Sequence, residues 1–320
     1  MYDWIGLLTR SERVHRALFR LAGWLPPRLL EAVLASAGRL VYRMLGAKTR
    51  SAIETNMRNM LGAEASGYVP GFARTYMANV AVTMYELLIG VYGLPRLRER
   101  GRLAGKFGVE GEHRLEEALQ AGKGAIVYTP HTGNFFYAYW YLSQRYDCLT
   151  VATAQSPELH PIYMKFKELG CRGFDYDITP PIELIRSLRR HVAGGGVVFL
   201  LGDFYRPAFP KTEWFGRPTR APEGAALLGI EQKVPIVPLH ASRMKGLRHR
   251  LRFGVPLMLH ERFGRHERAA ATIALNAELE RIIRADPTQW FYWFNANERW
   301  EEAEGPHDEH AGEQAAEFAG

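Results

Sequence analysis

Hydrophobic and polar residues follow two different patterns along this chain. In roughly the first 100 residues the apolar positions recur at helical spacing, whereas from Gly124 onward short apolar runs alternate with amphipathic segments. The first pattern is typical of packed helices and the second of alternating strands and helices. The sequence therefore predicts a helical region followed by an α/β region.

The second region predicts a specific order of elements. Strands are expected at 125–129, 148–154, 197–201, 236–240 and 251–255; helices are expected from about 134 and at 161–169, 181–192, 223–230 and 268–284. Such alternation favours a mostly parallel central sheet with helices on both faces. We expect an α/β fold in which residues 1–300 form one domain, helical in 1–100 and α/β in 101–300.

Two segments of the helical region are relevant to the question of membrane association. Residues 13–47 predict two helices joined at 24–27, in which arginines alternate with apolar residues. This pattern suits either a membrane interface or packing against the rest of the domain. Thr75–Pro95 is the most apolar stretch, but Asn79, Thr83 and Glu86 favour a buried core helix over a membrane span. No signal peptide is apparent.

Charge is distributed unevenly along the chain. The net charge is +7, but residues 301–320 hold seven acids and no Lys or Arg, so residues 1–300 carry +14 (41 basic against 27 acidic residues). A basic body favours anionic lipid, an acidic carrier protein or nucleic acid, and a solvated surface is the plain alternative. Nucleic acid is disfavoured because the aromatic residues fall in apolar runs. The acidic tail is expected to be disordered.

The first candidate for chemistry is His131, in the segment Tyr128-Thr-Pro-His-Thr-Gly-Asn-Phe-Phe136. The histidine follows a predicted strand and precedes a predicted helix, where active groups of parallel sheets lie. An imidazole can take a proton from an attacking hydroxyl or amine near neutral pH. The helix start behind it suits a developing oxyanion. A purely structural role is the alternative.

Two further candidates follow later strands. Asp203 comes directly after the run 197–201 and can orient His131, hold an acceptor or simply cap a turn. Arg217 and Arg220 are expected to flank a turn before a short helix, which suits a phosphate or pyrophosphate; a solvated basic loop is the alternative.

Other chemistries are not indicated. The chain has no G-x-S-x-G elbow, no P-loop, no G-x-G-x-x-G after a strand and no zinc-type Cys/His spacing. Cys148 and Cys171 lie in apolar runs without a basic neighbour, so neither is expected to be a nucleophile, and two cysteines suggest a reducing compartment.

In order and spacing, the motifs resemble the bacterial lipid A secondary acyltransferases and the related phosphatidylinositol mannoside acyltransferases, members of the lysophospholipid acyltransferase superfamily. The resemblance covers roughly residues 10–300. It rests on Arg50 with Asn56 and Arg58, His131-Thr-Gly-Asn-Phe, Gly202-Asp203, Trp214-Phe-Gly-Arg-Pro-Thr-Arg-Ala-Pro-Glu-Gly224, Pro235-Ile-Val-Pro238 and Gln289-Trp290.

The resemblance implies a lysophospholipid acyltransferase-like fold and direct acyl transfer without a covalent enzyme intermediate. It makes His131 the general base and expects an acid five residues later, but the residue there is Phe136. Asp203 can supply the missing carboxylate, or the reaction can need a weaker base, or the protein can bind acyl groups without transferring them. Candidate substrate-binding residues are Asn134, Phe136, Arg217, Arg220 and Glu223.

The predicted function is transfer of a fatty acyl group from acyl carrier protein or coenzyme A to a hydroxyl or amine of a glycolipid- or phospholipid-like acceptor. No cofactor or metal is expected beyond the thioester substrate. The acyl chain would enter an apolar tunnel formed by the helix at 75–95 and the aromatics after His131. Because no transmembrane anchor is apparent, we expect peripheral attachment at the cytoplasmic face of the bacterial inner membrane. The alternatives are acylation of a soluble natural-product intermediate and a catalytically silent lipid-binding protein.

Overall fold

The computed structural model describes residues 12–99, 101–120, 122–155 and 160–300. The predicted acidic tail lies outside these residues. The described N-terminal region is helical up to Lys106 and comprises α2 (Glu12–Ala22), α3 (Pro27–Met44), α4 (Ala47–Leu61), α5 (Val69–Leu88), α6 (Leu94–Glu99) and α7 (Leu103–Lys106), with 3-10 turns η1 (Ala63–Ala65) and η2 (Gly90–Gly93). The two predicted helices around the turn at 24–27 are therefore confirmed.

Strands and helices then alternate, as the sequence predicts. The strands are β1 (Phe107–Glu110), β2 (Ala125–Thr129), β3 (Cys148–Ala152), β4 (Arg172–Asp175), β5 (Val197–Leu201), β6 (Lys211–Trp214), β7 (Arg217–Arg220), β8 (Ile236–Met244) and β9 (Arg248–Phe253). The helices are α8 (His113–Gln120), α9 (Phe135–Arg145), α10 (His160–Glu168), α11 (Pro181–Ala193), α12 (Gly224–Gln232), α13 (Leu259–Arg262) and α14 (Arg268–Ala285), followed by η3 (Pro287–Gln289), η4 (Phe291–Phe294) and η5 (Ala296–Arg299).

Seven strands form one sheet in the order β1-β9-β8-β2-β5-β3-β4. All neighbours run parallel except β8 and β9, which pair antiparallel. The predicted mostly parallel α/β sheet is confirmed. In this order β2 and β5 are adjacent, with Thr129 opposite Leu201, so the residues that follow the two strands emerge side by side.

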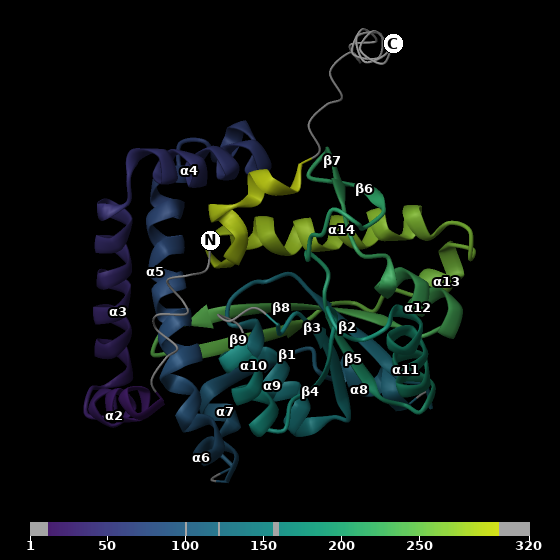
Figure 1. Cartoon of the computed structure of the whole chain (residues 1–320), viewed down its shortest axis with the longest axis horizontal. Helices are drawn as coiled ribbons and strands as arrows, with labels where there is room; N and C mark the ends of the chain where they lie inside the picture. The colour runs from purple at the N-terminus through teal and green to yellow at the C-terminus, as the bar shows by residue number, and fades with distance from the viewer. Residues whose placement is uncertain (1–11, 100, 121, 156–159, 301–320) are drawn as a thin grey trace, which may run out of the picture.

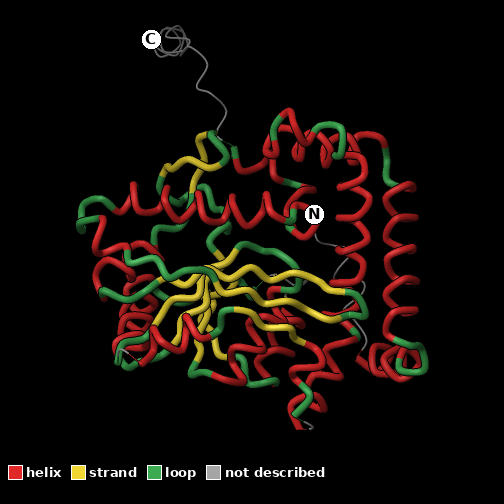
Figure 2. The backbone as a smooth tube through the Cα atoms, turned by 180° about the vertical axis from the view of Figure 1, so that it is seen from behind, coloured by secondary structure: helices red, strands yellow, loops and turns green. Residues whose placement is uncertain are grey.

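Helices cover both faces of the sheet (Figures 1 and 2). Side chains of β2 and β5 alternate between two apolar clusters: Val127 and Phe199 join the cluster with α5, α9 and α10, whereas Ile126 and Val198 join the one with α11, α12 and α14. This division follows from the two-residue period of a strand. It explains why both strands read as unbroken apolar runs, since each is buried on both faces.

A third cluster joins the N-terminal helices to the C-terminal segment. Trp290 and Trp293, both fully buried, pack with Met57 of α4 and Tyr76 of α5. The Tyr76 hydroxyl donates to the Phe291 carbonyl at 2.8 Å, and the Asn56 amide donates to the Trp293 carbonyl at 2.9 Å. These contacts hold residues 287–299 over the sheet.

Two elements differ from the sequence prediction or refine it. The segment from Arg217 to Arg220 is strand β7 of the β6–β7 hairpin and not a turn. The turn lies one step earlier, at Phe215-Gly216, where both residues have a positive φ and Trp214 pairs with Arg217. The helix expected at 75–95 is α5, which ends at Leu88.

Among the described residues, no single helix is long and apolar enough to cross a membrane. Val69–Leu88 and Gly90–Glu99 pass that test only when taken together, and they are bent by 52° at the break between them. Within α5 the buried residues include Tyr76, Val82 and Leu87, as expected of a core helix.

Candidate active site

His131 is positioned by a tight turn between β2 and α9. Gly133 in this turn has φ of +57°, and a Cβ there would lie 2.7 Å from the Ala241 carbonyl oxygen. Only glycine fits such a left-handed, crowded position without strain. The Gly133 amide donates to the Gln289 carbonyl at 3.0 Å, and the Phe291 amide donates to the His131 carbonyl at 2.9 Å. The C-terminal segment therefore fixes the turn from its other side.

The Asp203 carboxylate meets the imidazole from the end of the neighbouring strand. Its Oδ1 lies 2.6 Å from His131 Nδ1, and its Oδ2 accepts from the His131 backbone amide at 3.0 Å. Oδ2 also accepts from Trp290 Nε1 at 2.7 Å. The carboxylate side chain is fully buried. Burial alone would raise the pKa of Asp203, but the His131 ring and its hydrogen bonds, together with the Arg299 guanidinium, lower that pKa below its ordinary value.

This arrangement favours one tautomer of the His131 imidazole. With a carboxylate at Nδ1, the proton of the neutral ring belongs on that nitrogen, and Nε2 keeps its lone pair. The Tyr292 hydroxyl lies 3.2 Å from Nε2. His131 is buried, with 7% of its surface exposed, yet it lines a cavity. Nε2 is therefore placed to accept a proton there.

A cavity of about 740 Å³ extends from His131. Its lining includes Met84 and Leu87 of α5 and Phe135, Phe136 and Tyr139 of α9. Two of the aromatics after His131 that were expected to form the tunnel, Tyr137 and Trp140, do not line the cavity and are buried in the apolar cluster with α5, α9 and α10. The cavity is apolar enough to hold a hydrocarbon chain beside the imidazole.

Three predicted substrate-binding residues lie near this site in different roles. Phe136 lines the cavity and packs against Phe135 and Phe166. Glu223 also lines it, at the N-cap position of α12. Asn134 caps α9 by accepting from the Tyr137 amide at 3.1 Å and is itself buried.

Arg217 and Arg220 do not line the large cavity. The Arg217 guanidinium lies 4.6 Å from the centroid of the Trp300 ring, and Arg220 donates to the Phe209 carbonyl at 2.9 Å. These contacts stabilise the hairpin against neighbouring segments. Phosphate binding by the pair stays a prediction.

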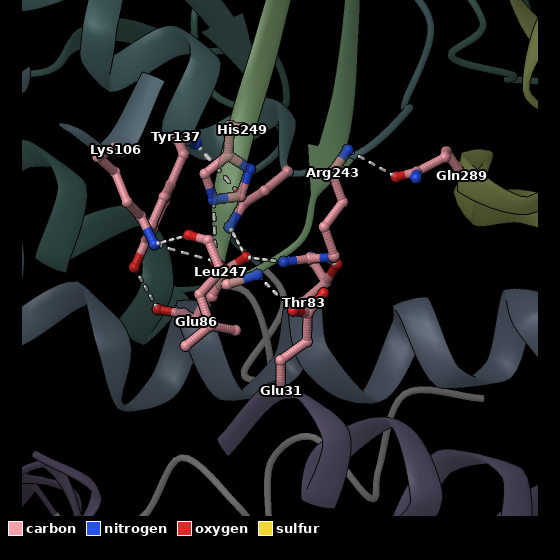
Figure 3. A network of polar contacts seen from close by, with 11 residues as sticks. Glu31, Thr83, Glu86, Lys106, Tyr137, Arg243, Leu247, His249 and Gln289 are labelled. Carbon is pink, nitrogen blue, oxygen red and sulfur yellow. Dashed lines mark hydrogen bonds and ion pairs between the residues drawn. The ribbon is translucent and has the colours of Figure 1, made fainter. Parts of the chain in front are cut away.

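A buried charged network that the sequence pattern did not predict lies behind the site. Glu86, 1% exposed, receives the Arg243 guanidinium at 2.8 Å, Lys106 Nζ at 3.3 Å and His249 Nε2 at 2.9 Å (Figure 3). Its Oε2 also accepts from the Asn134 amide at 3.0 Å, which connects the network to the His131 turn. In the sequence, the one sign of this network was Glu86, an acidic residue within the apolar stretch 75–95.

Electrostatics explain why Glu86 is charged there. Desolvation would raise its pKa, but Arg243, His249 and Lys106 hold the pKa well below the ordinary value. Burial lowers the pKa of His249 to about 4, more than Glu86 raises it, so this ring is neutral at pH 7 and donates a hydrogen bond. The Glu86 carboxylate is thus paired with two cations, Arg243 and Lys106.

The two cysteines are not suited to act as nucleophiles. Burial raises the pKa of Cys171 to about 12 and raises that of Cys148 as well, which leaves both thiols protonated. Within the described ranges, no group of three or more His, Cys, Asp or Glu side chains is arranged to hold a metal ion.

A histidine–carboxylate pair at adjacent strand ends, beside a long apolar cavity, has the geometry of an acyl-transfer site in an α/β protein. Comparison with known proteins agrees with this class. The family model described as bacterial lipid A biosynthesis acyltransferase matches residues 14–301. The chain belongs to this family and is an acyltransferase.

Two similar curated proteins carry the same name. The phosphatidylinositol mannoside acyltransferase of Mycolicibacterium smegmatis is 27% identical over 235 residues, which cover 71% of this chain and 73% of the relative. The phosphatidylinositol mannoside acyltransferase of Mycobacterium tuberculosis (H37Rv) is 32% identical over 161 residues, which cover 47% of this chain and 49% of the relative.

Proposed function

We propose that this protein transfers a fatty acyl group from a thioester, carried by acyl carrier protein or coenzyme A, to a hydroxyl or amine of a glycolipid- or phospholipid-like acceptor. The observation that supports this most directly is the 2.6 Å contact between His131 Nδ1 and Asp203 Oδ1, with His131 itself lining the apolar cavity. The names of the two relatives favour a glycolipid acceptor.

In the proposed reaction His131 is the general base. The acceptor's O–H gives its proton to Nε2 while its oxygen attacks the thioester carbonyl carbon, which forms a tetrahedral oxyanion. The C–S bond then breaks, and the leaving thiolate takes the proton back from Nε2. Asp203 stabilises the transient imidazolium through Nδ1–H, so the acid expected at position 136 is replaced from the neighbouring strand.

The reaction is proposed to occur at a membrane surface, the cytoplasmic face of the bacterial inner membrane. Trp24, 87% exposed, lies in the turn between α2 and α3, beside Leu21 at 64%. Exposed arginines of the same helices are Arg13, Arg16, Arg20, Arg28, Arg39 and Arg43. Apolar and basic side chains presented together suit an anionic lipid interface, where arginines reach the head groups.

The transfer reaction can be tested directly. Purified protein is mixed with palmitoyl-coenzyme A or palmitoyl-acyl carrier protein and a phosphatidylinositol mannoside, and both thiol release and acylated product are measured by mass spectrometry. We expect product with wild type and none with His131→Ala, whose fold is checked by circular dichroism. Turnover by His131→Ala would disprove the mechanism. Product from soluble acceptors alone would favour the natural-product alternative, and bound acyl chains without thioester loss would favour a silent lipid-binding protein.

Membrane attachment has its own test. We expect the protein to float with vesicles containing phosphatidylglycerol and to bind vesicles of phosphatidylcholine more weakly. Trp24→Ser with Leu21→Ser should abolish flotation and leave the melting temperature unchanged, since both side chains are exposed. Equal flotation of wild type and the double variant would rule out this surface.

A further inference from the structure

The C-terminal segment buries a cation beside the active site. Arg299, the last residue of η5, exposes 5% of its surface. Its guanidinium carbon Cζ lies 4.3 Å from the centroid of the Tyr292 ring and 5.5 Å from the centroids of the Trp290 and Trp214 rings. A desolvated cation is attracted to the faces of aromatic rings. These three rings therefore form an aromatic cage around the guanidinium.

The caged guanidinium also contacts the main chain of Asp203. Its Nη1 donates a hydrogen bond to the Asp203 backbone carbonyl. One residue earlier, the Gly202 amide donates to the Thr129 carbonyl at the end of β2, at 3.0 Å. The chain that carries the carboxylate is thus held by β2 on one side and by the C-terminal segment on the other.

Arg299 brings a permanent positive charge to this buried carboxylate. Burial would raise the pKa of Asp203, whereas the His131 ring and the Arg299 guanidinium lower it. A general base must be neutral before it accepts a proton, so in that state the imidazole gives Asp203 a hydrogen bond but no charge. A guanidinium does not lose its proton in proteins, so its charge acts on Asp203 in that state as well.

The β6–β7 hairpin completes the cage. Trp214 of β6 supplies one of the three rings, and the Thr219 hydroxyl of β7 donates to the Arg299 carbonyl at 2.6 Å. Thr219 is 2% exposed. Although the two arginines of this hairpin do not line the large cavity, the hairpin therefore reaches the active site through Arg299.

We propose that Arg299 is a positioning residue for acyl transfer, which holds Asp203 against His131 and keeps a positive charge beside the carboxylate. This inference rests on the proposed general-base role of His131. Arg299 does not line the large cavity, so it acts through Asp203 and not through a substrate. Lysine cannot replace it fully, because a planar guanidinium can stack on a ring and donate to a carbonyl at once, whereas an ammonium is a compact point charge.

The test compares three single variants. Arg299→Met removes the charge, and Arg299→Lys keeps the charge but loses the planar donor group. Arg284→Met is the matched control, because the Arg284 guanidinium lies 4.5 Å from the centroid of the Phe215 ring but is half-exposed and paired with Glu280. Folding is checked by melting temperature. The values of kcat and KM are measured with palmitoyl-coenzyme A and a phosphatidylinositol mannoside between about pH 5 and pH 9, which spans ordinary imidazole titration.

Other titratable groups near the pair do not obscure this profile. Tyr128 of β2 and Tyr292 of η4 face it; burial, and then the Asp203 charge, raises the pKa of Tyr128, and phenols ordinarily titrate at about pH 10. Asp177 and Glu223 line the same cavity and are present in every variant, so they contribute equally to each profile.

We expect Arg299→Met to lower kcat by up to ~10²-fold with KM near the wild-type value. The acid limb of its kcat/KM profile should move to higher pH by roughly one unit, because loss of a positive charge makes the His131–Asp203 pair easier to protonate. Arg299→Lys should keep the wild-type acid limb but lower kcat, and Arg284→Met should match wild type in both. If Arg299→Met does not fold, Arg299→Gln takes its place.

Three results would overturn the proposal. Wild-type kcat in the folded neutral variant would show that Arg299 is not needed at the site. A lower kcat at every pH with an unmoved acid limb would mean that the variant loses packing and not charge. Wild-type kcat in Arg299→Lys would remove the requirement for a guanidinium. Absence of transfer by wild type would instead contradict the proposed function itself.

Discussion

The imidazole of His131 and the carboxylate of Asp203 stand 72 residues apart in the sequence and 2.6 Å apart in space. Their strands, β2 and β5, are neighbours in the sheet, and each residue lies two positions after the last residue of its strand. The carboxylate is fully buried and receives two further hydrogen bonds, from the His131 amide and from Trp290. It is thus held rigidly against Nδ1, which favours a single tautomer of the ring.

Replacement of the carboxylate by an amide should therefore slow transfer more than it weakens substrate binding. We expect Asp203→Asn to lower kcat by ~10²–10⁴-fold with little change in KM, because the amide cannot stabilise the imidazolium. Trp290→Phe, which removes one hydrogen bond to Asp203, should have a much smaller effect. Steady-state kinetics measure both, and wild-type kcat in Asp203→Asn would exclude the carboxylate from the mechanism.

The Tyr292 hydroxyl next to Nε2 predicts a role in excluding water. An acceptor must displace this hydroxyl, 3.2 Å from Nε2, before it can give up its proton. Tyr292→Phe removes a hydrogen bond worth roughly 1 kcal/mol, so thioester hydrolysis in the absence of acceptor should rise about fivefold. Thiol release without acceptor measures this rate. A parallel fall of hydrolysis and transfer would indicate a structural role instead.

The buried Glu86 network predicts an acid-sensitive stability. The pKa of Glu86 in the folded protein lies well below its ordinary value, so the charged carboxylate adds to the free energy of unfolding. This stabilisation is fully present above the unfolded-state pKa of about 4.3, and it is lost as the pH falls from there toward the folded-state pKa. Glu86→Gln should destabilise the protein by ~3–5 kcal/mol at pH 7, since Arg243 and Lys106 lose their counter-charge.

The comparison for this variant is Glu110→Gln, at an exposed carboxylate paired with Arg252 at 2.9 Å, which should leave stability nearly unchanged. Urea unfolding of wild type and both variants between pH 3 and pH 7, a range chosen to span ordinary carboxyl titration, measures the difference. A stability of Glu86→Gln that equals wild type at pH 7 would contradict the proposed charge balance.

The Gly133 turn predicts a loss of activity from the smallest side chain. Gly133→Ala places a Cβ 2.7 Å from the Ala241 carbonyl oxygen at a positive φ, which should cost about 1–3 kcal/mol and displace His131. Gly216→Ala provides the matched control, because Gly216 also has a positive φ but no neighbour within 4 Å of the added Cβ. Activity and melting temperature are compared; equal activity of the two variants would show that the close approach is unimportant.

The sequence alone predicted five of the seven strands of the central sheet and the candidates for chemistry, but not the four-residue strands β1 and β4. A strand that is buried on both faces appears in the sequence as an unbroken apolar run, whereas an amphipathic helix has apolar residues at every third or fourth position. The mostly parallel α/β fold could therefore be predicted from the local pattern of apolar residues. His131 and Asp203 stood out because each follows such a run. The prediction was less accurate for Arg217 and Arg220, since the β6–β7 hairpin is short and polar.

Tertiary structure alone decided which candidates meet. Sequence spacing does not specify strand order, and only the adjacency of β2 and β5 makes Asp203, rather than position 136, the partner of His131. Likewise, Trp290 and Tyr292 reach the site because long-range packing of the C-terminal segment on α4 and α5 places them there. The cavity beside His131 is lined by residues of several helices and strands, so it is a property of the assembled layers and not of any one segment.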